Sequence, residues 1–257
     1  MVESDRLESG YSGKPESWVR IPPSPPKKEY LDIIPLKRSK IGQQNNYEKQ
    51  FSIRGKNMKH ILLSRLRNKN LTIAEYRNTA EKLGLILAAE TATFLQKQSI
   101  QIDTPISSGT GIKLKNNIVL IPILRSGLIL LASFLQFYEN ALVGFIGMKR
   151  DEKTAIPHLY YLNIPPIGEQ DDIILLDPMI ATGGSAAATL EILIKEGIKE
   201  EKIIFVAVIG SKEGCTHIKN KFPKIRLSVV EKDPTLTTNK FISPGLGDFG
   251  DRFFGTI

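Results

Sequence analysis

The chain has 257 residues, which suits one domain with a tail, and its hydrophobic content of 41% is enough for a sizeable core. No apolar run reaches the roughly 18 residues that a membrane-spanning helix needs, so we expect no membrane contact. The single cysteine, Cys215, excludes an internal disulfide bond, and the acidic start of the chain does not match a secretion signal. Together these features favour a cytoplasmic protein.

The first 57 residues differ from the rest of the chain. Their prolines are dense enough to prevent helices and central strands, so residues 1–57 are predicted to form a disordered basic arm and residues 58–257 a folded domain. The net charge of +8 lies near this end, because residues 1–70 hold 15 Lys and Arg against 7 Asp and Glu. We interpret this charge as a solvated tail, with contact to RNA or a membrane surface as the alternative. The neutral remainder disfavours nucleic acid as a partner.

A helix is predicted to begin after residue 72. Thr72 and Glu75 have the spacing of a capping box, in which the Thr72 hydroxyl caps an early helical amide while the Glu75 side chain reaches back. Apolar residues then recur every three or four positions and form one face of a helix that runs to about residue 95. These residues are Tyr76, Ala80, Leu83 and Leu87.

Four short apolar runs further along the chain are predicted to be strands of one sheet. Each run is continuous rather than alternating, which is typical of strands that are covered on both faces. Helical stretches follow three of the runs, so we predict an α/β fold with a central parallel sheet flanked by helices, and ligands at the carboxyl ends of its strands. The predicted strands cover 118–124, 142–148, 173–176 and 203–209, and the predicted helices cover 127–139, 184–196 and 211–221.

The segment Asp177–Ser185 follows one predicted strand and opens the next predicted helix. Its two adjacent glycines let the backbone approach a ligand closely, and the amides of the helix N-terminus can form a cradle for an anion. The Thr182 and Ser185 hydroxyls can donate to phosphate oxygens, while Asp177 can accept bonds from sugar hydroxyls or face a metal ion. The spacing excludes an ATPase P-loop and a dinucleotide fingerprint. A turn without a ligand is the alternative for the glycines alone, but the preceding carboxylate argues against it.

Two arginines each stand just after a predicted strand. Arg125 lies in the run Pro-Ile-Leu-Arg-Ser-Gly-Leu, and Arg150 begins the run Arg-Asp-Glu-Lys-Thr. A planar guanidinium can hold two phosphate oxygens at once and keeps its charge as a leaving group becomes more negative. Either arginine alone is better explained by an ordinary ion pair at a strand end. Both together, ahead of the phosphate-type loop, match the pattern of a protein family that is described below.

Residues 242–256 contain four glycines and one proline among several apolar residues. We therefore predict that this segment is packed against the domain but contains no regular structure.

These motifs together resemble one protein family. Residues 176–186 are similar to the phosphoribosyl-pyrophosphate loop of the type I phosphoribosyltransferases, in the form found in uracil phosphoribosyltransferases. The two arginine motifs resemble the family's pyrophosphate-binding motifs, and residues 242–256 resemble its uracil-binding loop. The resemblance runs from about Lys59 onward. It implies the type I phosphoribosyltransferase fold with a C-terminal loop or hood over the base, and the conversion of uracil and phosphoribosyl pyrophosphate to UMP and pyrophosphate.

The resemblance also implies roles for residues of this sequence. The implied catalytic residues are Arg125, Arg150 and Asp248, and the implied uracil-binding residues are Ile242, Gly247, Asp248 and Phe249, most of them through backbone groups. The residues implied to bind phosphoribosyl pyrophosphate are Arg125, Arg150, Asp177, Pro178, Met179, Ile180, Ala181, Thr182, Gly183, Gly184, Ser185 and Asp248.

Magnesium is the implied cofactor. We expect it to bind mainly through substrate oxygens and water, with Asp248 or Asp177 nearby, rather than in a cage of protein ligands. The implied partners are the substrates uracil and phosphoribosyl pyrophosphate and further copies of the chain in a homo-oligomer. The resemblance is also compatible with activation by GTP. No general base for the ring nitrogen of uracil is evident.

Residues 233–241 depart from the family pattern. The family reads Asp-x-Gly-Leu-Asn where this chain has Asp-Pro-Thr-Leu-Thr, and Phe241 replaces a tyrosine. These changes remove no group that is assigned to phosphate or base. They do keep open a second hypothesis, a non-catalytic homologue that senses a nucleotide. The basic arm supports a third hypothesis, an RNA-binding regulator on the same fold.

Overall fold

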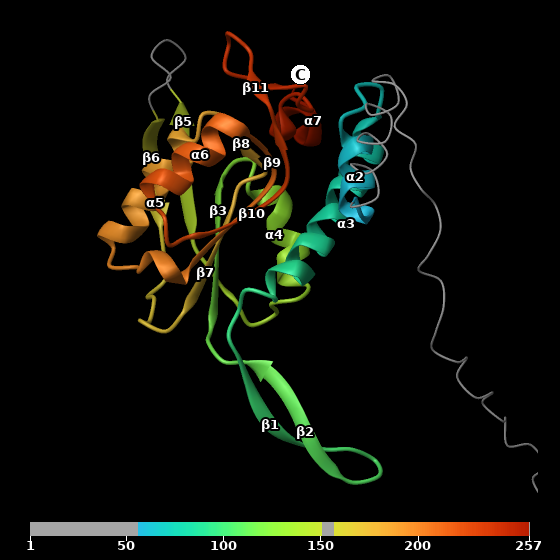
Figure 1. The fold of residues 1–257 in the computed structure, drawn as a ribbon, viewed down its shortest axis with the longest axis vertical. Coiled ribbons are helices and arrows are strands. Elements are labelled where there is room, and N and C mark those ends of the chain that lie inside the picture. Colours follow the sequence, from blue (N-terminus) through green and yellow to red (C-terminus); the bar gives the residue numbers. More distant parts are fainter. Residues whose placement is uncertain (1–55, 151–156, 257) are drawn as a thin grey trace, which may run out of the picture. The chain divides into compact units, whose positions relative to one another are not determined.

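A computed structural model describes residues 56–150 and 157–256, in which a sheet carries helices on both faces (Figure 1). The strand order is β10-β9-β7-β3-β5-β6, with β4 beside β3 and β8 beside β9. All neighbouring strands run parallel except β6, which is antiparallel to β5. The strands are β3 (Ile118–Leu124), β4 (Leu142–Val143), β5 (Phe145–Arg150), β6 (Pro157–Asn163), β7 (Asp172–Leu176), β8 (Met179–Ile180), β9 (Ile203–Ser211) and β10 (Arg226–Asp233).

The central strands are buried on both faces, and their side chains alternate between two separate core clusters. Along β7, Ile174 and Leu176 pack in one cluster, whereas Ile173 and Leu175 pack in the other. Successive side chains of a strand point to opposite faces, so a strand that is covered on both sides needs apolar residues at every position. This explains why the central runs are continuous in the sequence.

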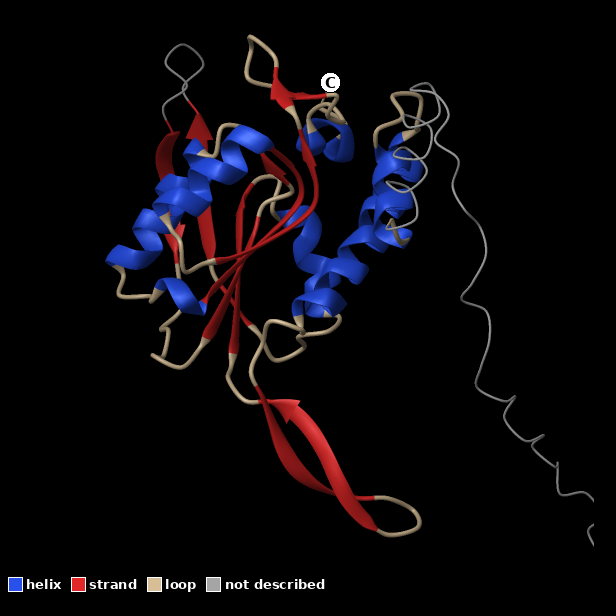
Figure 2. Cartoon of the chain, viewed as in Figure 1, coloured by secondary structure: helices blue, strands red, loops and turns tan. Residues whose placement is uncertain are grey.

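The helices form two layers, one on each face of the sheet (Figures 1 and 2). On one face, α3 contributes Leu83 and Leu87 to the first core cluster. On the other face, α5 contributes Leu190 and Leu193 to the second. Within the described ranges, no helix is both long and apolar enough to cross a membrane. The helices of the two layers are α2 (Met58–Leu66), α3 (Ile73–Thr91) and α4 (Leu128–Leu135) on the first face, and α5 (Gly184–Lys195) and α6 (Lys212–Lys221) on the second.

The predicted α/β fold is confirmed, and the local differences have physical causes. The capping box is present, since the Thr72 hydroxyl accepts from the Glu75 amide at 3.3 Å and the Glu75 carboxylate accepts from the Thr72 amide at 2.9 Å. The strand predicted over 142–148 is broken at Gly144, which packs tightly against Pro165. The helices predicted to reach residues 95 and 139 end earlier, and the parallel sheet has one antiparallel edge strand.

Several elements were not predicted from the sequence. They include helix α2, the two edge strands β6 and β10, and a hairpin of β1 (Lys97–Asp103) and β2 (Ser108–Leu114), which extends away from the sheet (Figure 2). Most of the hairpin is exposed, including Ile106 near its turn at 95% and Ile112 at 72%. Because it packs on no layer, the hairpin lacks the pattern of alternating buried residues by which a strand is recognised. The predicted arm, residues 1–57, lies almost wholly outside the described residues.

Residues 233–256, called the hood below, lie at the carboxyl end of the sheet. They include β11 (Thr235–Leu236), β12 (Ile242–Ser243) and a short helix, α7 (Phe249–Phe254). The prediction of no regular structure in 242–256 is therefore wrong. Helix α7 forms because the Asp248 carboxylate caps it, accepting from the Asp251 amide at 2.8 Å, and because Phe249 is anchored in the core.

A buried ion pair fixes the hood to helix α2. The Arg67 guanidinium donates to both Asp233 carboxylate oxygens, at 2.6 and 2.8 Å, and to the Gly245 carbonyl oxygen at 2.7 Å. The Gly245 amide donates to the same carboxylate at 2.7 Å, and the Asp233 side chain is only 4% exposed. Burial raises the pKa of the Asp233 carboxyl, but the hydrogen bonds from Arg67 and Gly245 and the Arg67 charge outweigh it and hold the pKa below its usual value.

A second arginine ties the same segments together. The Arg252 guanidinium donates to the carbonyl oxygens of Leu66, Asn68 and Leu246, each at 2.6 Å. It also lies over the Tyr76 ring, 4.3 Å from the ring centroid, where the negative face of the ring stabilises its charge. The two arginines therefore hold a segment rich in glycine against the helices that begin the described domain.

The Arg67–Asp233 pair should make stability depend on pH. Because the Asp233 pKa is lower in the folded chain, its contribution is fully present above the unfolded value of about 4 and is lost as the pH falls through the folded value. Asp233→Asn should lower the free energy of unfolding at pH 7 by about 3 kcal/mol, because it leaves the buried Arg67 without its counter-ion. The difference from the natural chain should shrink at pH 3.

Urea unfolding of both proteins at pH 7 and pH 3 measures this effect. Glu191→Gln is the matched control, because Glu191 pairs with Lys221 on the exposed surface and its loss should change stability little. An equal loss for Asp233→Asn at both pH values would contradict the role of the carboxylate charge.

Candidate active site

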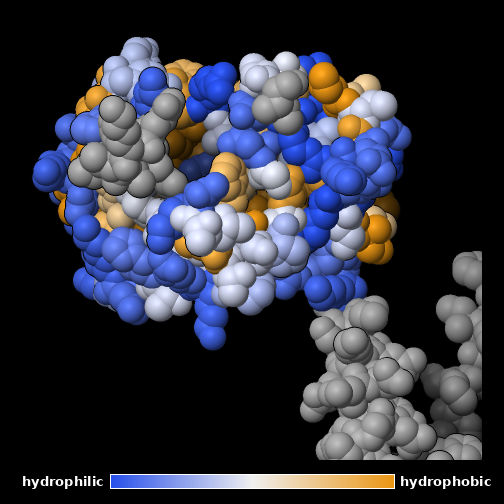
Figure 3. Space-filling model, turned by 90° about the horizontal axis from the view of Figure 1, so that it is seen from above, coloured by the Kyte–Doolittle hydropathy of each residue, from blue (hydrophilic) through white to orange (hydrophobic). Residues whose placement is uncertain are grey.

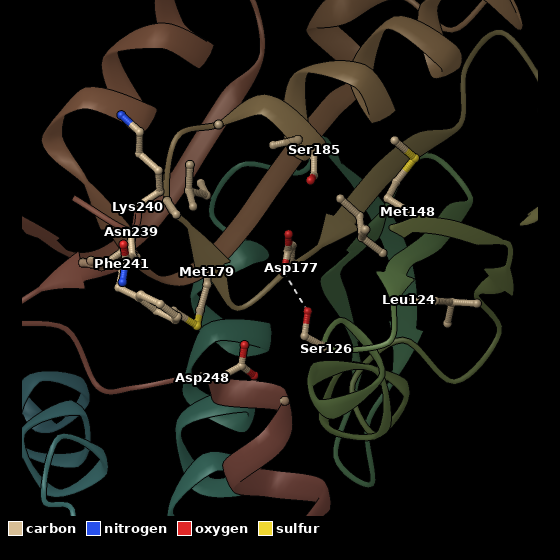
Figure 4. Close-up of a pocket in the computed structure, with 17 residues that line it drawn as sticks. Leu124, Ser126, Met148, Asp177, Met179, Ser185, Asn239, Lys240, Phe241 and Asp248 are labelled. Carbon is tan, nitrogen blue, oxygen red and sulfur yellow. Dashed lines mark hydrogen bonds between the residues drawn. The ribbon is translucent and has the colours of Figure 1, made fainter. Parts of the chain in front are cut away.

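A cleft of about 340 Å³ opens at the carboxyl end of the sheet. Figure 3, which looks onto this end of the domain, shows a hollow bordered by polar and apolar side chains. Side chains from distant parts of the chain meet there (Figure 4): Ser126 follows β3, Asp177 follows β7, and Ile242 and Asp248 belong to the hood. The parallel strand order explains the meeting, because the carboxyl ends of neighbouring parallel strands lie at one edge of a sheet.

The segment between β7 and α5, residues 177–185, forms one wall of the cleft and is called the phosphate loop below. Helix α5 begins at Gly184, and Gly183 precedes it in the left-handed conformation with φ of +81°. Residues with a side chain rarely adopt this conformation. The first amides of a helix have no partners within it, and Gly183 and Ser185 both line the cleft. This helix N-terminus is therefore suited to bind an anion.

Two residues at the start of α6 support the phosphate loop from its far side. The Ser211 hydroxyl donates to the Ala181 carbonyl oxygen at 2.5 Å and accepts from the Gly214 amide at 2.8 Å, which caps α6. Gly214 is so close to the loop that an added Cβ would collide with the same Ala181 oxygen. Sequence reasoning missed both roles. A serine three residues before a glycine at a strand end was the available signal, since serine favours helix N-caps.

Two carboxylates line the cleft. Asp177 is 8% exposed, and it accepts a hydrogen bond from the Ser126 hydroxyl at 3.0 Å (dashed line in Figure 4). Asp248 is exposed at the start of α7, and one of its oxygens caps that helix. Across residues 56–150 and 157–256, no three or more His, Cys, Asp or Glu side chains group closely enough to hold a metal ion.

Comparison with known proteins supports the family resemblance that the sequence motifs indicated. The family model described as uracil phosphoribosyltransferase matches residues 53–256. The chain belongs to the uracil phosphoribosyltransferase family. The uracil phosphoribosyltransferase of Malacoplasma penetrans is 38% identical over 194 residues, and that of Dictyoglomus thermophilum is 36% identical over 195 residues. Each alignment covers 76% of this chain and 93% of the relative. A solved structure of a protein from Aquifex aeolicus matches with a TM-score of 0.71 at 32% identity, covering 77% of this chain and 94% of that one.

Much of the site predicted for a uracil phosphoribosyltransferase converges on the cleft. Pro178, Thr182 and Gly184 belong to the phosphate loop without lining the cleft themselves. The predicted residues that do line it are Asp177, Met179, Ile180, Ala181, Gly183, Ser185, Ile242 and Asp248.

Of the remaining residues assigned by the family resemblance, three do not line the cleft, and a fourth, Arg150, is described by its backbone alone. Arg125 is beside the cleft, with its side chain 64% exposed and its Nη2 atom 3.5 Å from an Asp251 carboxylate oxygen. Arg150 ends β5, and its side chain lies outside the described part of the structure. Gly247 is exposed with φ of +81°, and the Phe249 ring is fully buried. The structure gives the positions of the predicted residues, and the roles of all of them stay predictions.

The cleft also contains residues to which sequence reasoning assigned no role. Met148 at the end of β5 forms part of one side, and the hood contributes Asn239, Lys240 and Phe241 (Figure 4). The departure of residues 233–241 from the family pattern was the available signal, because an unusual hood sequence changes the wall of the cleft in this uracil phosphoribosyltransferase family member.

The close packing behind the phosphate loop leads to a prediction for Gly214. Gly214→Ala should displace Ala181 and lower the free energy of unfolding by about 1–3 kcal/mol, as overpacking of a tight site does. Gly109→Ala is the matched control, because Gly109 lies on the exposed hairpin with nothing within 4 Å of an added Cβ. Denaturant unfolding of both variants measures the difference. Equal stability in the two variants would mean that the contact between α6 and the loop is not tight.

Proposed function

We propose that this protein is a uracil phosphoribosyltransferase, which transfers the phosphoribosyl group of phosphoribosyl pyrophosphate to uracil and releases UMP and pyrophosphate. The observation that carries the proposal is a single cleft lined by the phosphate loop, by Asp177 and Asp248, and by the hood. The curated relatives at 36–38% identity bear this name and support the same reaction here. The relatives do not favour a nucleotide sensor or an RNA-binding regulator.

The phosphate loop supports the binding of the sugar phosphate. Amides at the start of α5 and the Ser185 hydroxyl provide donors for the phosphate oxygens, and the helix dipole favours a negative charge there. Asp177, held by the Ser126 hydroxyl, is an acceptor for the ribose hydroxyls. We propose that these groups fix the sugar before the anomeric carbon reacts.

The two arginines are proposed to assist the leaving group. As pyrophosphate departs, positive charge develops on the ribose and negative charge increases on the leaving group, so fixed cations lower the barrier. Arg125 lies between the cleft-lining residues Leu124 and Ser126, and among the described residues its exposed side chain contacts a carboxylate oxygen of Asp251 at 3.5 Å. It can therefore turn toward a bound pyrophosphate. We propose the same role for Arg150 at the end of β5.

Magnesium is the proposed cofactor. Asp177 and Asp248 both line the cleft, and carboxylate oxygens are ligands that magnesium prefers. We propose that they hold the ion directly or through water, while substrate oxygens complete its coordination. When bound, the ion neutralises charge on the pyrophosphate group.

The hood is proposed to recognise the base. Ile242 and Asp248 line the cleft, and backbone groups at Ile242, Gly247 and Phe249 are proposed to hydrogen-bond the edge of uracil. Phe241 also lines the cleft and is 54% exposed, so its ring offers an apolar surface to a planar ligand. The buried ring of Phe249 fixes the backbone around it, which suits a site that reads its ligand through main-chain atoms.

We also propose that the protein acts as a homo-oligomer through the β1–β2 hairpin. An isolated two-stranded hairpin is marginally stable in water, and this one leaves Ile106 95% and Ile112 72% exposed. A second copy of the chain that covers these residues would supply the missing layer. We further propose a reducing, cytoplasmic setting, supported by the single and buried Cys215. Activation by GTP stays a prediction of the family resemblance.

The choice of base tests the proposed function. Uracil presents an acceptor at C4 and a donor at N3, whereas cytosine presents an amino donor and a bare ring nitrogen. Two buried mismatches at about 1–3 kcal/mol each should lower kcat/KM for cytosine by roughly a hundredfold or more. Steady-state assays with phosphoribosyl pyrophosphate, magnesium and each base measure this. Absence of UMP formation, or comparable use of cytosine or a purine, would contradict the proposal.

One pair of variants connects the turnover to this cleft. Arg125→Ala should lower kcat/KM at least about tenfold, because it removes a charge-assisted contact to the leaving group. Arg65→Ala is the matched control, since Arg65 is an exposed arginine on α2 whose nearest carboxylate, Glu75, is 3.9 Å away. Equal activity in the two variants would remove Arg125 from the mechanism.

The hairpin proposal predicts a change of assembly. Replacing Ile106 and Ile112 together by aspartate should shift the protein toward smaller species, because the contact would then bury charges. Ile61→Asp is the matched control, since Ile61 is 62% exposed on α2 outside the hairpin. Sedimentation velocity at several concentrations measures the species. A monomeric natural chain, or an unchanged oligomer in the double variant, would contradict the proposal.

A further inference from the structure

The turn at residues 237–241 presents Lys240 to the cleft. Three hydrogen bonds close this turn: the Thr237 amide donates to the Phe241 carbonyl oxygen at 2.8 Å, and the Lys240 amide donates to the Thr237 carbonyl oxygen at 2.9 Å. The third runs from the Phe241 amide to the Thr237 hydroxyl at 3.1 Å. The turn is therefore defined by its own bonds, and it fixes where the Lys240 side chain leaves the backbone.

Lys240 has an uncommon backbone conformation. Its φ is +63°, and within residues 56–150 and 157–256 no other residue except glycine has a positive φ. The left-handed conformation is strained for a residue with a side chain, whereas glycine adopts it freely. Glycine or asparagine would fit this position with less strain. The stability of the turn therefore does not explain a lysine at residue 240, and a role in the cleft would explain it.

The charges of the cleft suggest that role. Among the described residues that line the cleft, Lys240 carries the single positive charge, and Asp177 and Asp248 carry two negative ones. The Lys240 side chain is exposed, and its ammonium group has no hydrogen-bond or ion-pair partner in the described part of the chain. A strongly anionic substrate entering between two carboxylates gains most from a cation that is not already paired.

The position of Lys240 indicates which part of the substrate it meets. Figure 4 shows Lys240 and Ser185 on the same side of Asp177, with Ser126 and Asp248 on the other. Lys240 thus lies on the side of the cleft toward Ser185 of the phosphate loop. In Figure 4 its side chain extends away from Asp177, so it must turn inward about its flexible side-chain bonds to touch a ligand in the cleft.

We propose that Lys240 binds the phosphate group on the ribose of the substrate, the group that the product UMP retains, when that phosphate occupies the phosphate loop. This inference rests on the proposed function, from which it takes the identity of the ligand. Lys240 then acts as a binding residue supplied by the hood. It adds a cation to a cradle that otherwise consists of neutral amides and hydroxyls, so the hood contributes to holding the sugar as well as the base.

The test uses three variants of the full chain. Lys240→Asn and Lys240→Gly remove the charge but suit the left-handed backbone, while Lys240→Arg keeps the charge. Lys224→Asn is the matched control, because Lys224 is an exposed lysine in the turn before β10, at the amino end of the sheet. Calorimetric titration with UMP, with phosphoribosyl pyrophosphate plus magnesium and with inorganic pyrophosphate gives the three affinities.

For Lys240→Asn and Lys240→Gly, we expect the Kd for UMP and for phosphoribosyl pyrophosphate to rise about tenfold, with a shallower dependence on salt concentration. The Kd for inorganic pyrophosphate should stay within about twofold, and the melting temperature should not fall, because the strain at residue 240 is relieved. Lys240→Arg and Lys224→Asn should bind like the natural chain.

Two outcomes would overturn the proposal: unchanged UMP affinity in both uncharged variants, or a loss confined to inorganic pyrophosphate. A variant that binds weakly and also melts at a lower temperature would assign Lys240 to the structure of the turn instead. These readouts do not depend on turnover. If the natural chain binds UMP but forms none from uracil, the proposed function fails while the comparison at residue 240 still stands.

Discussion

The hood depends on two partly buried arginine side chains, Arg67 and Arg252, and the cleft depends on the hood. Residues 233–256 contain little regular structure of their own, so their backbone carbonyls need partners from elsewhere in the chain. Arg67 and Arg252 supply these partners. Their charge-assisted bonds reach the Asp233 carboxylate, carbonyl oxygens of the hood and the carbonyl oxygen at the end of α2. Because an arginine offers several donors in one rigid plane, each side chain joins several backbone segments at once.

The phosphate loop depends on a different constraint, because the backbone of α6 must lie close to the backbone of the loop. A loop that binds an anion through amides must expose them, so it needs positions without a Cβ and support from behind. Gly183 provides the left-handed turn, while Gly214 and Ser211 allow α6 to approach and hold the Ala181 carbonyl oxygen. Two walls of the cleft are thus stabilised in different ways. Long arginine side chains hold the hood, whereas close backbone packing at glycines holds the phosphate loop.

The sequence predicted the central sheet well because burial on both faces leaves a strong signal: Ile118–Leu124 and residues 173–176 are apolar throughout. Strand β3 has the predicted bounds, and β7 begins one residue earlier than predicted, at Asp172. The place of the phosphate loop between a strand and a helix was equally predictable, because its residues are consecutive in the sequence. The hairpin was missed because no layer covers it, and helix α7 because a cap at Asp248 outweighs the local glycines. The contact of Gly214 with Ala181 joins residues that are distant in sequence, and it is visible only in three dimensions.

The ties between α2 and the hood also have a consequence for synthesis on the ribosome. Most of the sheet and its two helical layers can pack as soon as β10 has left the exit tunnel, because only the first core cluster takes buried residues from the hood, namely Ile242, Leu246 and Phe249. The cleft, in contrast, has no lid until residues 242–256 emerge and meet a helix made about 180 residues earlier, a separation seen in the bond from Arg252 to Leu66. The nascent chain therefore forms most of its scaffold while the cleft is still open and inactive. The active site is completed late in synthesis, when the end of the domain binds to its beginning.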